Sequence, residues 1–152
     1  MAKKQKRLAG SFIRIKLDEN RHTYGRVLEG ALFAFYDAVT NEELSPAEIK
    51  AKPILFKIWV MNRAVTTGRW EIIGNEPLEK GLLEQPYFFK KDALNPEKLS
   101  LYHEGKESPA TLEQCKNLEC AAVWDAEHVE DRLRDHYAGK PNKWLESMKP
   151  KS

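Results

Sequence analysis

The sequence predicts an α+β fold: a strongly curved, mainly antiparallel sheet of about six strands, a C-terminal amphipathic helix and one or two short helices. Two observations carry this prediction. Segments in which apolar and polar side chains alternate follow one another closely between residues 12 and 36, as half-buried strands do. Residues 125–137 instead repeat apolar side chains at helical spacing. We also expect the curved sheet to close partly into a barrel.

The first three strands are expected at residues 12–17, 22–28 and 31–36. In the first of them, Arg14 and Lys16 alternate with apolar residues and therefore take the opposite face. The links between the three segments are only a few residues long. Because such short links join antiparallel neighbours, we expect a meander.

The middle of the chain predicts a short helix and then further strands. Ser45 and Glu48 have the spacing of a capping box, and Pro46 occupies the first helical position. Residues 54–61 are strongly apolar and predict a strand. Residues 70–73 predict another strand, and weaker signals follow at 87–89, 99–102 and 118–123.

The clearest helix is expected near the end of the chain, after a second capping box that starts at Thr111. Asp125 stands at its N-cap, and Val129, Leu133 and Tyr137 recur at a spacing of four on one face. Gly139 lies where a helix commonly ends. One side of this helix is therefore expected to pack on the sheet.

We expect residues 1–152 to form one domain, because this length is typical of a single domain. Within it we expect a flexible basic tail over residues 1–9, a folded core over 10–144 and a flexible end over 145–152. The sequence has no long apolar run and no recognisable export signal. With only two cysteines, which are expected to stay reduced, this pattern predicts a cytoplasmic protein.

Motifs for catalysis are missing from the sequence. No nucleophile elbow, P-loop or glycine-rich dinucleotide motif is present. Asp125, His128 and Asp131 have a helical spacing that suits a metal, but an N-cap and a solvated helix face explain them more simply. We therefore expect no catalytic residue, no cofactor and no metal.

Charge is unevenly distributed although the formal net charge is only +2. Residues 1–26 carry eight basic and two acidic side chains, whereas residues 104–131 carry two basic and eight acidic ones. Arg14, Lys16, Arg21 and Arg26 beside Tyr24 would suit nucleic acid. The acidic segment opposes that interpretation, so nucleic-acid binding is not expected.

Several stretches between residues 10 and 138 resemble the immunity protein 26 family of bacterial polymorphic-toxin systems, and their order and spacing carry the resemblance. They are Gly10-Ser11-Phe12 with Arg14, Ile15 and Leu17; Tyr24-Gly25-Arg26-Val27-Leu28; Ala34-Phe35-Tyr36-Asp37; Pro53-Ile54-Leu55-Phe56; Trp70 with Ile72-Ile73-Gly74; and Ala121-Ala122-Val123-Trp124.

The resemblance implies a small cytoplasmic protein that binds and neutralises a cognate toxin encoded beside it. The same grouping also carries a phosphotriesterase-like label, which leaves a small hydrolase as one rival interpretation. A nucleic-acid or other interaction module is the second. Because the matched motifs are mostly glycine, aromatic and aliphatic, no catalytic residue is carried over.

Two sets of residues are candidates for binding. Tyr24 and Arg26 would line a pocket, or else be a cross-strand tyrosine and a surface arginine. An acidic surface would suit a cationic toxin. Its expected members are Glu104, Glu107, Glu127, Glu130 and Asp131, the last three on the exposed side of the final helix. The oligomeric state is left open.

Overall fold

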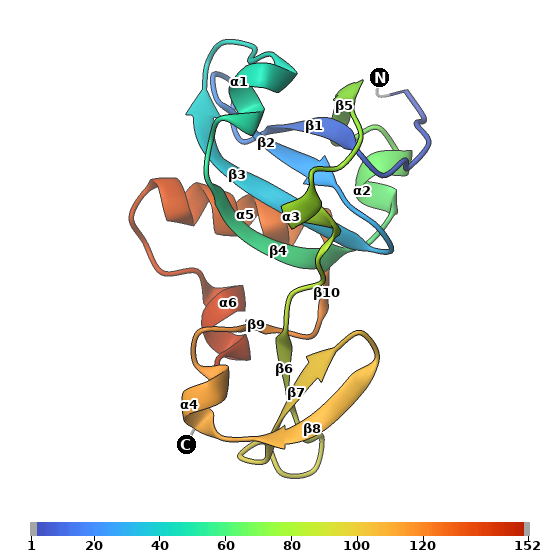
Figure 1. The fold of residues 1–152 in the computed structure, drawn as a ribbon. Coiled ribbons are helices and arrows are strands. Elements are labelled where there is room, and N and C mark those ends of the chain that lie inside the picture. The colour runs from blue at the N-terminus through green and yellow to red at the C-terminus, as the bar shows by residue number, and fades with distance from the viewer. Residues whose placement is uncertain (1–2, 151–152) are drawn as a thin grey trace.

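The computed structural model describes residues 3–150 and arranges them as two sheets with helices around them (Figure 1). The strands are β1 Ser11–Lys16, β2 His22–Val27, β3 Leu32–Thr40, β4 Ile54–Val60, β5 Glu71–Asn75, β6 Phe88–Lys91, β7 Leu99–His103, β8 Lys106–Ala110, β9 Glu119–Cys120 and β10 Val123–Trp124. The helices are α1 Pro46–Lys50, α2 Arg63–Thr66, α3 Lys80–Leu83, α4 Leu112–Cys115, α5 Ala126–Tyr137 and α6 Lys143–Met148.

The larger sheet has six strands in the order β10-β4-β3-β2-β1-β5. The pairs β1–β2, β2–β3 and β3–β4 are antiparallel, which confirms the predicted meander. Only the short β10 is parallel to its neighbour, β4. Gly25 of β2 lies close to β3, since a Cβ there would stand 2.9 Å from the Ala34 carbonyl oxygen.

A second sheet of four strands, in the order β8-β7-β6-β9, lies below the first in Figure 1. Its β7–β8 hairpin turns through Glu104 and Gly105, whose φ angles are 48° and 82°. Left-handed conformations at both central residues are those of a type I′ hairpin turn. The sequence does not predict β8, because Lys106–Ala110 is polar, mostly exposed and contains Pro109.

The α+β class is confirmed, but two expectations about the sheet are wrong. Among residues 3–150 the strands divide into two sheets, and neither sheet closes into a barrel. The chain leaves the larger sheet after β5 and starts a new one at β6, so β5 and β10 remain its two edges. Helices are also more numerous than expected. The sequence does not predict α2, α3 and α6, because they have only four to six residues and show little periodicity.

The main core lies between the larger sheet and α5. Val129 and Leu133 of α5 are fully buried and belong to the same apolar cluster as Phe33, Phe35 and Trp70. The Trp70 ring meets both phenylalanine rings edge to face, at centroid distances of 5.8 and 5.6 Å. The apolar face predicted for the helix over residues 125–137 is therefore confirmed on α5.

Helix ends follow the predicted capping pattern in most places. Both capping boxes form, at Ser45 with Glu48 and at Thr111 with Gln114. Asp125 occupies the N-cap of α5, but its side chain pairs with Arg63 at 2.7 Å rather than with the helix. Gly139, at φ 69°, ends α5 in the left-handed conformation expected there.

Parts of both termini contact the rest of the structure. The Gln5 amide donates to the carbonyl oxygens of Val65 and Trp70 and accepts from the Ile72 amide. Leu145 and Met148 of α6 pack against the main core. Residues 1–2 and 151–152, which belong to the expected tail and end, lie outside the described residues. One domain with a flexible start and end stays a prediction.

A partly buried ion pair connects α5 with both sheets. The Nη1 and Nη2 atoms of Arg132 donate to the two carboxylate oxygens of Glu119 in β9, each at 2.8 Å. The guanidinium also lies 3.6 Å from the ring centre of Phe56 in β4 and 5.2 Å from that of Trp124 in β10. Arg132 thus joins the helix, the larger sheet and the smaller sheet at one point.

The two cysteines remain free thiols, as expected. Cys115 of α4 is fully buried in a small cluster with Phe89 and Leu99 of the second sheet, and Cys120 packs against it. Burial raises the pKa of both thiols. Their thiolate forms are therefore disfavoured at neutral pH, and thiolate is the reactive form of cysteine.

We predict that Arg132→Ala lowers the free energy of unfolding by about 3 kcal/mol, since the substitution leaves the Glu119 carboxylate unpaired in a partly buried site. Lys116→Ala is the control, because its pair with Glu113 is exposed and should change stability by less than about 0.5 kcal/mol. Urea unfolding followed by tryptophan fluorescence measures both. Equal midpoints for the two variants would refute the role given to Arg132.

We also predict that both thiols of the folded protein react with a disulfide reagent such as DTNB at least about tenfold more slowly than those of the urea-unfolded chain. The measurement is release of the chromophore at pH 8, with the unfolded protein as the reference for two thiols per chain. A burst of one equivalent from the native protein would show an accessible, activated cysteine.

Candidate functional site

The five carboxylates expected to form an acidic surface lie on two separate elements. Glu104 and Glu107 belong to the β7–β8 hairpin of the smaller sheet. Glu127, Glu130 and Asp131 belong to α5, which packs on the larger sheet. Figure 1 shows the hairpin and the helix in different halves of the structure.

The two hairpin carboxylates are exposed and each has a cationic or ionisable neighbour. The Glu104 side chain is 63% exposed, and its Oε2 lies 3.6 Å from Nδ1 of His103. Glu107 is 51% exposed and accepts a 2.7 Å bond from the Lys90 ammonium. Glu104 is therefore the carboxylate of the hairpin with more unused bonding capacity.

On α5 the expectation that Glu130 lies on the exposed side is wrong. Glu130 is 5% exposed, and its carboxylate accepts two 2.7 Å bonds from Arg69. The Trp70 indole donates a third, at 2.9 Å. This carboxylate is drawn inward because it satisfies a buried indole N–H, which would otherwise lack a partner.

The other two α5 carboxylates remain at the surface. Asp131 is 41% exposed and accepts a 3.0 Å bond from Arg134. Glu127 is exposed in the first turn of the helix. An anionic surface on α5 therefore centres on Glu127, with Asp131 partly neutralised.

Tyr24 and Arg26 are both fully buried, so Arg26 is not the surface arginine of the alternative interpretation. The Arg26 guanidinium donates to the carbonyl oxygens of Gly10, Glu76 and Pro77 and to the carboxylate of Glu79. It also lies 4.0 Å from the Phe12 ring centre. These bonds engage the planar fork of the side chain, which fixes the link between β5 and α3.

The hydroxyl group of Tyr24 is likewise engaged. It donates to the Glu42 carbonyl oxygen at 3.0 Å and accepts from the Leu44 amide at 3.2 Å. These contacts fasten the polar segment after β3 onto the sheet. The neighbours of Tyr24 and Arg26 are thus protein groups that fill their surroundings.

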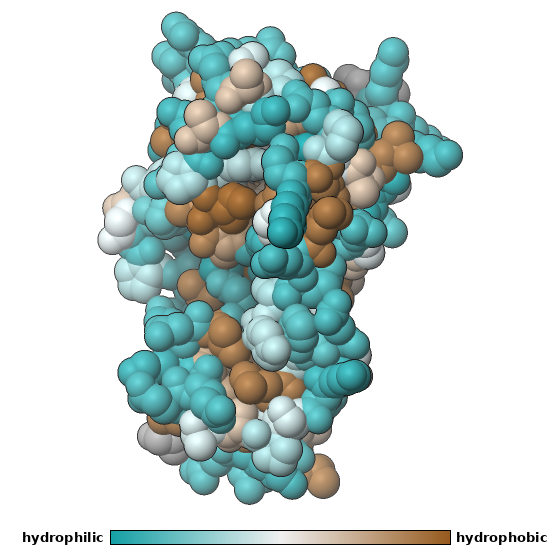
Figure 2. Space-filling model, viewed as in Figure 1, coloured by the Kyte–Doolittle hydropathy of each residue, from teal (hydrophilic) through white to brown (hydrophobic). Residues whose placement is uncertain are grey.

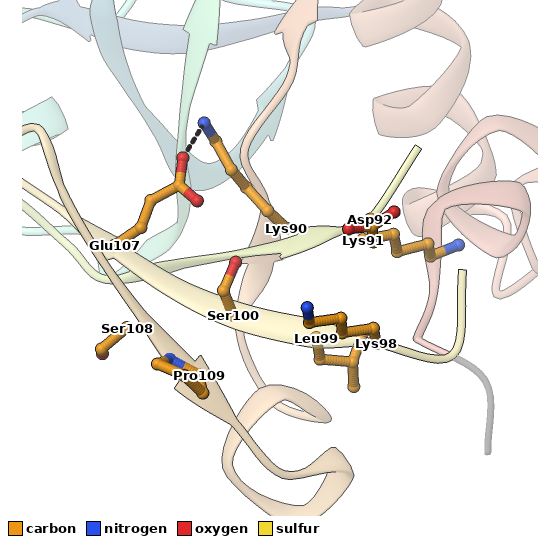
Figure 3. Close-up of a pocket in the computed structure, with 9 residues that line it drawn as sticks. All are labelled: Lys90, Lys91, Asp92, Lys98, Leu99, Ser100, Glu107, Ser108 and Pro109. Atoms are coloured by element: carbon orange, nitrogen blue, oxygen red, sulfur yellow. Dashed lines mark hydrogen bonds and ion pairs between the residues drawn. The ribbon is translucent and has the colours of Figure 1, made fainter. Parts of the chain in front are cut away.

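A hollow of about 440 Å³ opens on the smaller sheet, between β6, β7 and β8 (Figure 3). Its polar lining combines Lys90, Lys91 and Lys98 with Asp92 and Glu107. The Lys90–Glu107 pair spans one side of it, as Figure 3 shows. The Asp92 carboxylate accepts from two amides of its own loop, which lowers the pKa of that group. The hollow thus carries charges of both signs, of which only Lys90 and Glu107 form an ion pair among the described residues.

The histidines take separate positions. His128 stacks on Trp144 at 3.8 Å, His103 stacks on Tyr87 at 3.9 Å, and His136 lies 3.9 Å from Asp37. Within residues 3–150 no three His, Cys, Asp or Glu side chains come together as metal ligands would. Asp125 and Asp131, which the sequence placed near His128, pair with arginines instead.

The basic residues considered for nucleic acid are also engaged within the protein. Arg14 donates to Glu71 at 2.8 Å, and Arg21 donates to Asp18 at 2.7 Å. Arg26 is buried. These pairings reduce the positive charge that the β1–β2 surface presents.

In the part of the chain that the structure describes, no helix has the length and apolar character needed to cross a membrane.

One exposed aromatic pair was not among the sequence candidates. Tyr87 is 53% exposed, and its ring lies parallel to that of His103, with an interplanar angle of 5°. The two residues are sixteen positions apart, and only the β6–β7 pairing brings them together.

Exposed apolar surface gathers in the middle of the face shown in Figure 2, between hydrophilic ends.

Comparison with known proteins gives one result. The family model described as immunity protein 26 matches residues 9–100, which is more than half of the chain. No curated protein and no solved structure matches. The matched residues run from the start of β1 into β7 and include the buried Tyr24 and Arg26. The chain therefore belongs to the immunity protein 26 family.

Proposed function

We propose that this protein binds and neutralises a cognate bacterial toxin in the cytoplasm, as the immunity component of a polymorphic-toxin system, and that it does so without catalysis. The match to the immunity protein family over residues 9–100 carries this proposal. It implies a protein partner, because an immunity protein acts on a toxin.

The surface chemistry supports recognition of another protein. Tight protein interfaces depend on a few aromatic or arginine anchors within a charged surround. The structure offers an exposed, stacked tyrosine at Tyr87 and exposed carboxylates at Glu104, Glu107 and Glu127. We propose that these carboxylates, which lie on the β7–β8 hairpin and on α5 in the two halves of the structure, face cationic parts of the toxin surface, with Asp131 beside Glu127 on α5.

The non-catalytic part of the proposal rests on how the polar groups are used. The buried side chains of Arg26, Glu130 and Arg132 bond to groups of the protein itself. Burial also raises the pKa of both thiols, which opposes nucleophilic chemistry. These groups thus stabilise a surface on which binding takes place.

We predict that the protein restores growth of cells that express the toxin domain encoded beside its gene. Purified protein should form a stable complex with that domain, made with an inactivating substitution, in gel filtration and calorimetry. The Arg132→Ala variant should protect less, because it lowers the folded fraction. Full toxicity in the presence of soluble wild-type protein, without any complex, would contradict the proposed function.

We further predict that Glu107→Lys and Glu127→Lys each weaken toxin binding by about tenfold at low salt, mainly through a slower association rate. Glu113→Lys is the matched control, since it also reverses an exposed acidic residue but lies on α4. Surface plasmon resonance at two salt concentrations separates the variants. Association rates equal to those of the control would remove these carboxylates from the interface.

A further inference from the structure

The ladder of the smaller sheet continues past β6 into an aromatic pair at the surface. Phe88 pairs with Tyr102, so the residues next in line are Tyr87 and His103. Their rings stack at a centroid distance of 3.9 Å. Because His103 covers one face of the Tyr87 ring while Tyr87 remains 53% exposed, the opposite ring face is open to solvent.

A backbone bond holds this pair in place before any partner arrives. Nε2 of His103 lies 3.0 Å from the Gln85 carbonyl oxygen, and it must donate because a carbonyl only accepts. Gln85 precedes Tyr87 by two residues, so the bond ties the histidine to the segment that carries the tyrosine. A fixed aromatic ring loses little conformational entropy on binding, which favours affinity.

Exposed carboxylates belong to the two segments that carry the stacked rings. Glu104 is 63% exposed, and the left-handed turn, with φ 48° at this residue, places its carboxylate 3.6 Å from Nδ1 of His103. Glu84, three residues before Tyr87, is exposed at the end of α3, next to the half-exposed Leu83. Lys106 is the cross-strand partner of His103 and disfavours a cation on its own side.

An open aromatic face with exposed carboxylates on its neighbouring segments has the chemistry that recognises arginine. A guanidinium stacks on an aromatic face and donates in its own plane to carboxylates, whereas an ammonium lacks the planar surface. We propose that Tyr87, His103, Glu84 and Glu104, here called the stacking platform, bind an arginine side chain on a cationic surface of the toxin. This inference rests on the proposed function and names the group recognised.

The test measures binding of full-length variants to the inactivated toxin domain encoded by the neighbouring gene, by calorimetry at low and high salt. Tyr87→Ala should weaken binding by about 10- to 100-fold, and Tyr87→Phe, which keeps the ring face, by less than about threefold. The double variant Glu84→Gln/Glu104→Gln should weaken binding by about tenfold and reduce its salt dependence. Glu113→Gln serves as the surface control.

The outcomes separate the two proposals. Equal toxin affinities of the wild-type protein and the Tyr87→Ala variant overturn the stacking platform and leave the proposed function intact. Loss with Tyr87→Ala but no effect of the double carboxylate variant overturns the assignment to a cation. Failure of the wild-type protein to bind overturns both proposals. As a further test, each toxin arginine is replaced singly by lysine. At one position this replacement should weaken binding as much as Tyr87→Ala does. Combining that replacement with Tyr87→Ala should then cause no further loss of affinity.

Discussion

The bidentate pair between Arg132 and Glu119 is the interaction on which the arrangement of this protein depends. The two sheets already meet through the rings of Trp59 and Phe88, at a centroid distance of 4.4 Å. The arginine adds a directional link from α5, because it reaches the second sheet through Glu119 while its flat guanidinium packs on Phe56 and Trp124 of the first. Replacing the pair by apolar residues would save the cost of removing two charges from water. Only the directional fork of an arginine, however, satisfies a carboxylate while stacking on aromatic rings.

Buried charge recurs as a way of fixing segments that have little apolar surface. Arg26 holds the link between β5 and α3 through backbone carbonyl groups, and Glu130 accepts a hydrogen bond from the Trp70 indole beside the main core. Each group is bonded on several sides, which is what makes its burial tolerable. A single conformation is thereby specified for segments that hydrophobic packing alone would leave loosely defined.

Local signals explain how far the fold could be predicted from the sequence. Alternating apolar and polar residues identified the meander, and apolar residues four apart identified α5. The two capping boxes were also predicted correctly. Each of these signals depends on residues close together in the chain. The weaker strand signals fell on β6, β7 and β9, but β8 and the separation of these strands into a second sheet escaped prediction, since the exposed β8 has no apolar pattern. Glu130 was misplaced because its burial is decided by Trp70, sixty positions away, rather than by its neighbours on the helix.

The proline in β8 has a consequence for how this protein can be approached. Its strand forms the outer margin of the smaller sheet, and an unprotected margin invites another chain to extend the sheet through main-chain bonds. Pro109 has no amide hydrogen to offer such a chain. Self-association by strand addition is therefore disfavoured at this border, and docking through side chains, which differ between proteins, is favoured over docking through a backbone that all proteins share.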